Sequence, residues 1–338
     1  MTPTVWRDAV LYESTSDRVV CLLCPFACAL ADGQSGRCHV RRRTGDRVQT
    51  RTYASAVAHL DSIERKPLYH FRPGIKALTL AAPGCMFRCE YCVNHRISQF
   101  GRSMGSGPPT SAVDVADVVS TAAKQGACVA LSYSEPGLAP ELTLALAAAG
   151  RECGVDVVWK TNGFLTERAV DLVGPSLAAA NVDLKSIDEV AHRRLTGAPV
   201  APVVRTIGRL RERGVWVEVS TPLIPGISGE PAALQVIAAT IAAIDPGIPW
   251  HLLRFTPAYR MSDSDPTLPD ALDRAQHIGW ETGLRYVYVE RALGAPGRAT
   301  YCPGCGTVLV ERDVWGLASS RLSGGRCPDC GRHAEGRW

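Results

Sequence analysis

The stretch KALTLAAPGCMFRCEYCVNHR, residues 76–96, joins a short β-rich run directly to three closely spaced cysteines. These are Cys85, Cys89 and Cys92, in the spacing C-x3-C-x2-C. A closed thiolate metal site normally has four ligands, and disulfides form between pairs of cysteines. Three thiolates on one loop therefore leave one coordination position for another ligand. The β-rich run also begins a repeating pattern that extends to residue 290.

In this pattern, β-rich runs alternate with amphipathic helical stretches. The expected strands are residues 76–84, 127–137, 156–163, 180–186, 215–226, 250–257 and 285–290. The expected helices are residues 111–125, 139–152, 165–174, 203–214 and 231–244, the first with a capping box of Ser111 and Asp114. At about 30 residues per unit, the alternation indicates right-handed βαβ units and a parallel sheet. We predict an α/β fold, a partial (β/α)6-type TIM barrel.

Active sites of such barrels gather at the carboxyl ends of the strands. Polar residues lie in or directly after the expected strands of this chain: Cys85, Glu135, Asn162, Asp183, Lys185, Thr221 and His251. We therefore expect the functional site on this rim. The Gly/Ser/Pro-rich segment 98–111 is expected to be a connector, with a lid as the alternative.

Composition excludes several classes of protein. The 338 residues are 46% hydrophobic and 21% charged, as in a globular protein. The 37 basic and 33 acidic residues are too evenly balanced to argue for nucleic acid. There is no apolar run long enough to span a bilayer, and the first residues lack the pattern of a signal peptide. We expect a cytoplasmic protein without a membrane or nucleic-acid partner.

Eleven of the 13 cysteines form three clusters, which divide the chain into three regions. We expect an N-terminal Cys-rich metal-binding region over residues 1–55, the barrel over residues 56–295, and a C-terminal metal-binding appendage over residues 296–338. In a cytoplasmic chain such spacings predict metal sites rather than disulfides. The other two cysteines, Cys128 and Cys153, are expected to be buried apolar thiols.

The C-terminal cluster consists of Cys302-x2-Cys305 and Cys327-x2-Cys330. This spacing is typical of a zinc ribbon or a rubredoxin-like pair of knuckles. A structural zinc would fold a tail that is too small for a core of its own. Redox-active iron is the alternative.

The N-terminal cluster is Cys21, Cys24, Cys28 and Cys38, which is also a complete ligand set. Its spacing does not distinguish zinc from an auxiliary iron–sulfur cluster. We favour zinc, because nothing in the sequence marks a path for electrons.

Further motifs accompany the three central cysteines in a fixed order. ERKPLYHFRPG precedes them, and YSEPG, KTNGF, VDLKS, TPLIPG and HLLRFTPAY follow. This series resembles the radical S-adenosylmethionine (radical SAM) superfamily, in particular the pyruvate formate-lyase activating enzymes. With both flanking cysteine clusters included, the chain most resembles the radical SAM enzymes of the AmmeMemoRadiSam system.

The resemblance implies a 4Fe–4S cluster on Cys85, Cys89 and Cys92, with the amino and carboxylate groups of SAM on the fourth iron. One electron from a flavodoxin- or ferredoxin-type reductant would then split SAM into methionine and a 5′-deoxyadenosyl radical. That radical abstracts a hydrogen atom from the substrate. The competing interpretation of the three cysteines is a zinc site completed by His95.

The resemblance also implies contacts to SAM. Glu135 matches the residue that contacts the SAM amino group, Lys185 would pair with the methionine carboxylate, and His251 would bond to the ribose or carboxylate. The implied cofactor-binding residues are Tyr91, Glu135, Lys160, Asn162, Asp183, Lys185 and His251.

Three positions depart from the family pattern. Met86 and Val93 stand where the family usually has Asn and Gln. Lys160 stands where the activating enzymes have an acidic residue that helps bind a monovalent cation near SAM. An ammonium group at this place would replace the charge of that cation, and a surface lysine is the alternative.

Three functions are compatible with these observations. The leading one is a radical SAM enzyme acting directly on an unidentified substrate, a small molecule or a peptide or protein, at the barrel mouth. The second is an activase that installs a glycyl radical on a protein partner. The third is a zinc-ribbon interaction protein whose barrel is not catalytic, against which the intact cysteine trio argues.

Overall fold

The computed structural model describes residues 6–15, 18–102, 108–290 and 296–338. Its centre is an eight-stranded sheet in the order β16-β15-β14-β13-β12-β11-β9-β8. Seven of these strands are parallel: β9 (Lys76–Leu80), β11 (Ala127–Leu131), β12 (Val157–Thr161), β13 (Ala179–Asp183), β14 (Trp216–Leu223), β15 (Trp250–Arg254) and β16 (Val287–Glu290). They are the seven predicted strands. The eighth strand, β8 (Ala58–Ser62), was not predicted and pairs antiparallel with β9.

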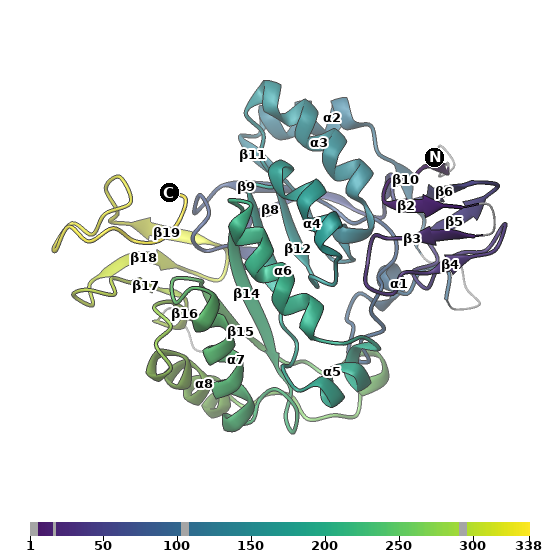
Figure 1. Cartoon of the computed structure of the whole chain (residues 1–338). Coiled ribbons are helices and arrows are strands. Elements are labelled where there is room, and N and C mark those ends of the chain that lie inside the picture. Colours follow the sequence, from purple (N-terminus) through teal and green to yellow (C-terminus); the bar gives the residue numbers. More distant parts are fainter. Residues whose placement is uncertain (1–5, 16–17, 103–107, 291–295) are drawn as a thin grey trace.

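Helices pack along the outer side of this sheet (Figure 1). They are α2 (Val115–Lys124), α3 (Pro140–Cys153), α4 (Glu167–Val173), α5 (Glu189–Thr196), α6 (Ala201–Glu212), α7 (Pro231–Ile244) and α8 (Pro269–Glu281). A short helix, α1 (His95–Ser98), follows the central cysteines. The five predicted helices are present, whereas α1, α5 and α8 were not predicted.

Short 3-10 turns complete the barrel connections. They are η1 (Ile63–Arg65), η2 (Pro136–Leu138), η3 (Gly174–Ser176), η4 (Tyr259–Met261) and η5 (Pro296–Arg298). The segment 98–111 connects α1 to β10 (Ser111–Ala112), but its residues 103–107 lie outside the described part of the chain.

Two local expectations were wrong. The predicted capping box does not form, because Ser111 lies in strand β10 and the Asp114 side chain caps α2 by accepting from the Asp117 amide at 3.1 Å. Cys153, expected to be buried, is exposed at the last turn of α3, while Cys128 in β11 is fully buried as expected.

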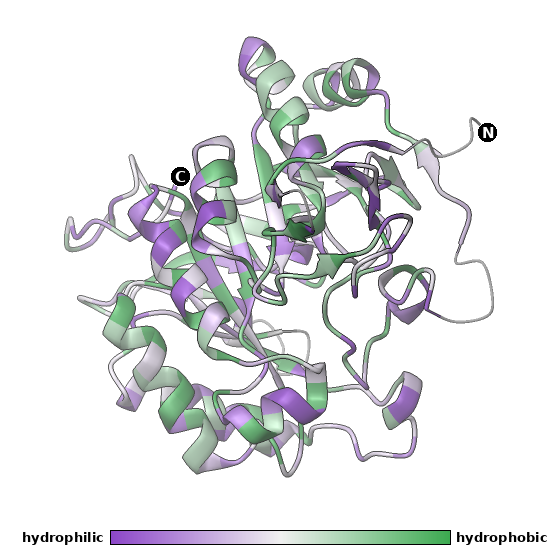
Figure 2. Cartoon of the chain, turned by 45° about the vertical axis from the view of Figure 1, so that its right-hand side comes forward, coloured by the Kyte–Doolittle hydropathy of each residue, from purple (hydrophilic) through white to green (hydrophobic). Residues whose placement is uncertain are grey.

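The core lies between the sheet and its helices. All eight residues of β14 and all five of β11 are buried, as is usual for parallel strands covered on both faces. Figure 2 shows hydrophobic residues along the central strands, and helices that carry both hydrophobic and hydrophilic residues. Burial of these apolar faces, at roughly 25 cal/mol per Å², fixes how the strands and helices pack.

Small antiparallel sheets precede the barrel. One has the order β1 (Arg7–Asp8), β6 (Arg47–Thr50), β5 (Arg41–Thr44), and another the order β2 (Tyr12–Ser14), β3 (Val19–Cys21), β4 (Ala29–Leu30). A third pairs β7 (Ala54–Ser55) with β10. The buried guanidinium of Arg41 contacts Glu141 of α3 at 3.3 Å, which joins this region to the barrel.

The C-terminal residues form a sheet of β17 (Thr300–Tyr301), β18 (Val308–Arg312) and β19 (Leu317–Ser320), on the side of the barrel away from the N-terminal strands (Figure 1). Arg312 is almost fully buried and donates to the carbonyl of Tyr69 at 2.6 Å and of Arg298 at 3.0 Å. None of the helices in the described ranges is both long enough and apolar enough to cross a membrane.

Candidate active site and metal centres

The loop after β9 carries the three central cysteines at the carboxyl end of the sheet. The Phe87 amide donates to Cys85 Sγ at 3.3 Å, Asn162 Nδ2 donates to the same sulfur at 3.4 Å, and Cys92 Sγ hydrogen-bonds to Ser98 Oγ at 3.2 Å. Burial raises the pKa of Cys85 well above its usual value. Such polar contacts to sulfur suit an iron–sulfur cluster, whose potential depends on them.

Glu135 is held rigidly beside this loop. Its Oε1 accepts from the Gly137 amide at 2.8 Å and the Thr161 hydroxyl at 2.6 Å, and its Oε2 accepts from the Asn162 amide at 2.8 Å. Burial raises the pKa of Glu135 to about 7, although these three donors oppose the shift. A carboxylate has about four acceptor sites, so three donors leave one for a further cation or amine.

Asp183, at the end of β13, lies between two lysines. Lys185 Nζ donates to Asp183 Oδ2 at 2.9 Å, and Lys160 Nζ donates to Asp183 Oδ1 and, at 2.5 Å, to Asn181 Oδ1. Burial alone would raise the pKa of Asp183, but the two ammonium groups lower it to about 2. Two ammonium groups therefore face the Asp183 carboxylate. Lys160 is half-buried in this network, so the alternative of a surface lysine was wrong.

Other predicted residues join this group. Lys185 Nζ lies 5.6 Å from the ring centre of Tyr91, which itself belongs to the cysteine loop. Lys185 and Asp183 both influence the pKa of Cys89, which burial raises to about 12. The structure thus brings together the cysteine loop, Tyr91, Asp183, Lys185 and the Glu135–Asn162 pair.

Two residues on the predicted rim contact other partners among the described residues. His251 is the second residue of β15, and its Nε2 contacts Glu218 Oε2 at 2.6 Å with both side chains fully buried. The rings of Tyr69 and Tyr288 pack against His251 at 4.8 and 5.2 Å. Thr221 is also fully buried and accepts from the Trp250 indole at 2.9 Å. In the register of the sheet, His251 pairs with Ser220, which in turn pairs with Asp183. The expected contact of His251 with SAM stays a prediction.

The departures from the family pattern have different environments. Met86 is buried, and its sulfur accepts a hydrogen bond from Asn162 Nδ2 at 3.4 Å. Val93, by contrast, is 66% exposed. His95 Nδ1 is 3.3 Å from the Cys92 carbonyl oxygen, and its ring stacks on Tyr259 at 4.5 Å. Within the described residues, His95 does not form a compact ligand group with the cysteine thiols.

The four N-terminal cysteines lie in one buried region. Cys21, Cys24 and Cys38 are buried and Cys28 is half-buried. Burial raises the pKa of Cys24, and the neighbouring thiols of the other three add to this effect. The amide of Cys21 donates to the carbonyl of Cys28 at 3.0 Å, which closes the loop between them.

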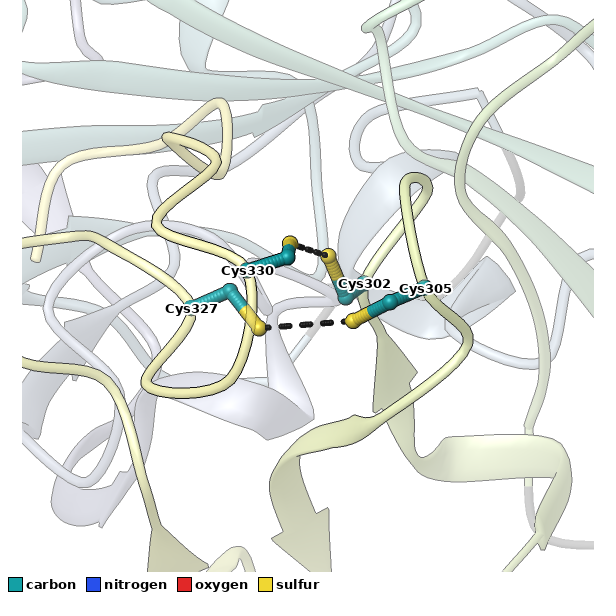
Figure 3. A group of neighbouring side chains, drawn as sticks. All are labelled: Cys302, Cys305, Cys327 and Cys330. Atoms are coloured by element: carbon teal, nitrogen blue, oxygen red, sulfur yellow. Dashed lines mark hydrogen bonds between the residues drawn. The ribbon is translucent and has the colours of Figure 1, made fainter.

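The four C-terminal cysteines converge at the tips of two turns (Figure 3). The sulfurs of Cys302 and Cys330 are 3.5 Å apart, those of Cys305 and Cys327 are 3.6 Å apart, and all four lie within 4.8 Å of one another. Four thiolates at about 2.3 Å from one tetrahedral zinc have nearly this separation. The arrangement therefore fits a single metal ion.

Sequence reasoning missed two residues that organise the site. Asn181 lies two positions before Asp183, on the same face of β13, so strand periodicity could have identified it. Arg102 lies in the segment 98–111, and its guanidinium donates to the Cys85 carbonyl oxygen at 2.6 Å and the Phe87 carbonyl oxygen at 2.8 Å. No local pattern indicated this role for Arg102.

A parallel, partly open barrel with three cysteines after its first strand defines a class of iron–sulfur enzymes. Residues 80–234 match the radical SAM superfamily. The chain is 30% identical over 336 residues to the uncharacterized protein MJ0808 of Methanocaldococcus jannaschii, covering 97% of this chain and 99% of that protein. It is also 30% identical to an isethionate sulfite-lyase activating enzyme of Nitratidesulfovibrio vulgaris, over 39% of this chain and 43% of that one.

Among solved structures, a radical SAM methyltransferase from Sphaerobacter thermophilus matches with a TM-score of 0.50 and 16% identity, over 85% of this chain and 78% of that chain. This likeness concerns the fold. The chain belongs to the radical SAM superfamily. Membership implies a 4Fe–4S cluster and SAM as cofactors, and enzymatic cleavage of SAM to generate a radical.

Proposed function

We propose that this protein cleaves SAM at a 4Fe–4S cluster held by Cys85, Cys89 and Cys92, and uses the resulting radical to abstract hydrogen from a substrate at the barrel mouth. The observation that carries the proposal is the gathering of charged and polar side chains around the cysteine loop at the carboxyl end of the sheet. A cluster with only three protein ligands supplies an open iron for SAM and the electron that cleaves it.

The chain's own residues would hold SAM by complementary charge. Glu135 has one acceptor site left after its three donors, which suits the ammonium of the methionine moiety. The ammonium groups of Lys160 and Lys185 beside Asp183 would attract the methionine carboxylate. Tyr91 and Asn162 would flank this region, because Asn162 donates to Cys85 and Tyr91 lies beside Lys185.

The fixed backbone partners of Glu135 matter for orientation. Because its carboxylate is held by the amides of Gly137 and Asn162, it would hold the amino group of SAM in one position without reorganising. The burial of Lys185 and Glu135, beside the half-buried Asp183, would exclude bulk water from the same region. A radical formed there would be protected from side reactions with solvent.

The test is anaerobic reconstitution with iron and sulfide, followed by addition of dithionite and SAM. We expect 5′-deoxyadenosine to form without added substrate, and a variant with all three cysteines replaced by Ala to form none. Cys153→Ser, which changes an exposed cysteine outside the three clusters, is the matched control and should behave as wild type. Continued SAM cleavage by the triple variant would refute the assignment.

A second candidate is a glycyl-radical activase, and the similarity to an isethionate sulfite-lyase activating enzyme favours it. The two candidates differ in the molecule that gives up hydrogen. Perdeuterated extract of the source organism, separated by ultrafiltration into small-molecule and protein fractions, would supply the donor. Deuterium transferred to 5′-deoxyadenosine only from the protein fraction, together with a glycyl-radical signal in that fraction, would favour the activase.

We also propose a structural zinc at Cys302, Cys305, Cys327 and Cys330, supported by the spacing of their sulfurs. The division into regions 1–55, 56–295 and 296–338 is part of the same proposal. Metal-ligand clusters of free cysteines suit a reducing compartment, so we propose action in the cytoplasm with a flavodoxin- or ferredoxin-type reductant.

A further inference from the structure

We infer that Cys21, Cys24, Cys28 and Cys38 hold a second iron–sulfur cluster, and that it passes electrons from an external donor to the loop of Cys85, Cys89 and Cys92. This reverses the sequence-based preference for zinc. The inference rests on the proposed function, because it supposes that the central loop needs an electron. Five observations carry it.

The backbones of the two cysteine loops are in direct contact. Gly84, directly before Cys85, has φ of +95°, and a Cβ added there would lie 2.8 Å from Val40 Cγ1 and 3.3 Å from the Cys38 carbonyl oxygen. Only glycine fits so close an approach. Gly84, next to the first central cysteine, therefore lies against the backbone of the last N-terminal cysteine and the side chain of Val40.

Arg102 ties the same two segments together. Its Nη2 donates to the Arg37 carbonyl oxygen at 2.8 Å and to the Cys85 carbonyl oxygen at 2.6 Å. Arg37 directly precedes Cys38. The rigid, planar guanidinium of Arg102 thus links the residue before Cys38 with Cys85.

Aromatic rings also run from one loop to the other. Phe26 lies between Cys24 and Cys28 in the sequence, and its ring centre is 4.9 Å from that of Phe164. Phe164 is in turn 5.4 Å from Phe87, which lies between Cys85 and Cys89. Both Phe164 and Phe87 are almost fully buried. Three packed aromatic rings therefore connect the two loops.

The arrangement of the sulfurs differs from that of the C-terminal site. In the part of the chain that the structure describes, the compact group within 4.8 Å consists of the C-terminal four, and neither the N-terminal cysteines nor the central trio forms one. Thiolates of one zinc ion must be compact, whereas thiolates of an iron–sulfur cluster bind different irons and stand wider apart. The N-terminal four thus resemble the trio.

The N-terminal region also has little need of a zinc ion to stabilise its fold. Cys21, Cys24 and Cys38 belong to the same hydrophobic core as the barrel strands and Cys89, whereas the C-terminal cysteines have a small core of their own. Structural zinc typically compensates for a missing core.

The electron balance is simple. A reduced flavodoxin-type donor loses one electron, the electron passes through the N-terminal site to the central loop, and the N-terminal site ends unchanged. At the central loop that electron is consumed in breaking one carbon–sulfur bond of SAM, which gives methionine and the deoxyadenosyl radical.

Iron analysis tests the site separately from SAM cleavage. The variant with Ala at Cys85, Cys89 and Cys92, reconstituted anaerobically with ferrous iron and sulfide, should retain iron, acid-labile sulfide and cluster absorbance. Adding Cys28→Ser should remove them, and adding Cys153→Ser as the matched control should not. If the triple Ala variant with Cys28→Ser added is insoluble, electron paramagnetic resonance of the reduced triple variant alone decides whether a second iron–sulfur cluster is present. A triple variant without iron and sulfide, or with zinc at these cysteines, would overturn the inference even if wild-type protein cleaves SAM.

The relay is tested with the central trio intact. In Cys28→Ser, formation of 5′-deoxyadenosine driven by reduced flavodoxin should be lost, while formation driven by the small reductant dithionite should persist. Equal losses with both reductants would overturn the relay. Wild-type protein that holds two clusters but cleaves no SAM would instead contradict the proposed function and leave the second cluster in place.

Discussion

Replacing Lys160 by Met is the sharpest test of how the site recognises SAM. Lys160 Nζ donates to Asn181 Oδ1 at 2.5 Å and to Asp183, and its side chain is 17% exposed. The substitution removes one of the two positive charges around Asp183 and keeps a linear apolar stem. We expect weaker SAM binding and unchanged iron content.

The structure sets the magnitude. In Lys160→Met, Asp183 keeps its hydrogen bond from Lys185 at 2.9 Å, and Asn181 Oδ1 still accepts from the Ser220 hydroxyl at 2.7 Å. Each acceptor therefore retains a hydrogen-bond donor. The substitution removes one positive charge from the site. A charge-assisted hydrogen bond is worth about 1.5–3 kcal/mol, which corresponds to about one to two decades in SAM affinity.

Lys160→Asp tests whether a monovalent cation can replace the lysine ammonium. A carboxylate at position 160 would stand beside Asp183 and Asn181 Oδ1, and three oxygens together are a ligand set for a hard cation. SAM affinity should then recover in part when potassium or sodium is supplied. This would reproduce the cation of the activating enzymes.

The assay is titration of the reconstituted proteins with SAM by equilibrium dialysis, with and without monovalent salt, alongside iron analysis. Lys124→Met, at the exposed end of α2, is the matched control and should bind SAM as wild type does. Unchanged affinity in Lys160→Met would refute the reasoning. Loss of iron would show that Lys160 serves the cluster loop instead.

Three further predictions concern stability and metal content. Folding raises the pKa of Glu135 from 4.5 to about 7, so the folded state binds this proton more tightly than the unfolded chain does. As pH rises from about 4.5 to 7, the free energy of unfolding of the metal-free wild type should therefore fall by about 3 kcal/mol more than that of Glu135→Gln. If urea unfolding shows the same pH dependence of this free energy in both proteins, the prediction is wrong. Cys302→Ala should release one zinc and make residues after 296 sensitive to protease, and iron in place of zinc in the wild-type tail would contradict the assignment. Gly84→Ala should lower the free energy of unfolding in urea by about 1–3 kcal/mol, because a methyl group strains both the φ of +95° and the contact with Val40. Adding Val40→Ala should recover only the share of this loss that comes from the contact. An unchanged free energy of unfolding in Gly84→Ala would show that the two loops separate freely.

Local patterns allowed the barrel to be predicted in detail. The seven parallel strands and five of the helices follow from runs of a few residues, because burial on both faces of a parallel strand demands continuous apolar residues and an outer helix demands a periodic apolar face. The strand β8 was missed because it lies at the edge, pairs antiparallel, and consists of exposed and half-buried residues.

The three cysteine clusters could be recognised in the sequence, since cysteine spacing is a property of the chain itself. The spacing did not determine which metal each cluster would hold. For the C-terminal four, the tertiary structure adds the convergence of two distant turns, with Cys305 and Cys327 sulfurs 3.6 Å apart. For the N-terminal four, it adds the contact between Gly84 and Cys38, which joins two segments separated by 45 residues of sequence.

The sequence by itself determined the class of fold, the three cysteine clusters and the residues at the ends of the strands. Tertiary structure alone decided which of those residues meet. The His251 imidazole contacts Glu218, which lies three residues before Thr221 in β14, while Lys160 and Lys185 share Asp183. The physical reason is that strand identity depends on local burial patterns, whereas the height of a side chain in the barrel depends on the register between strands. That register is fixed by packing among residues far apart in the chain.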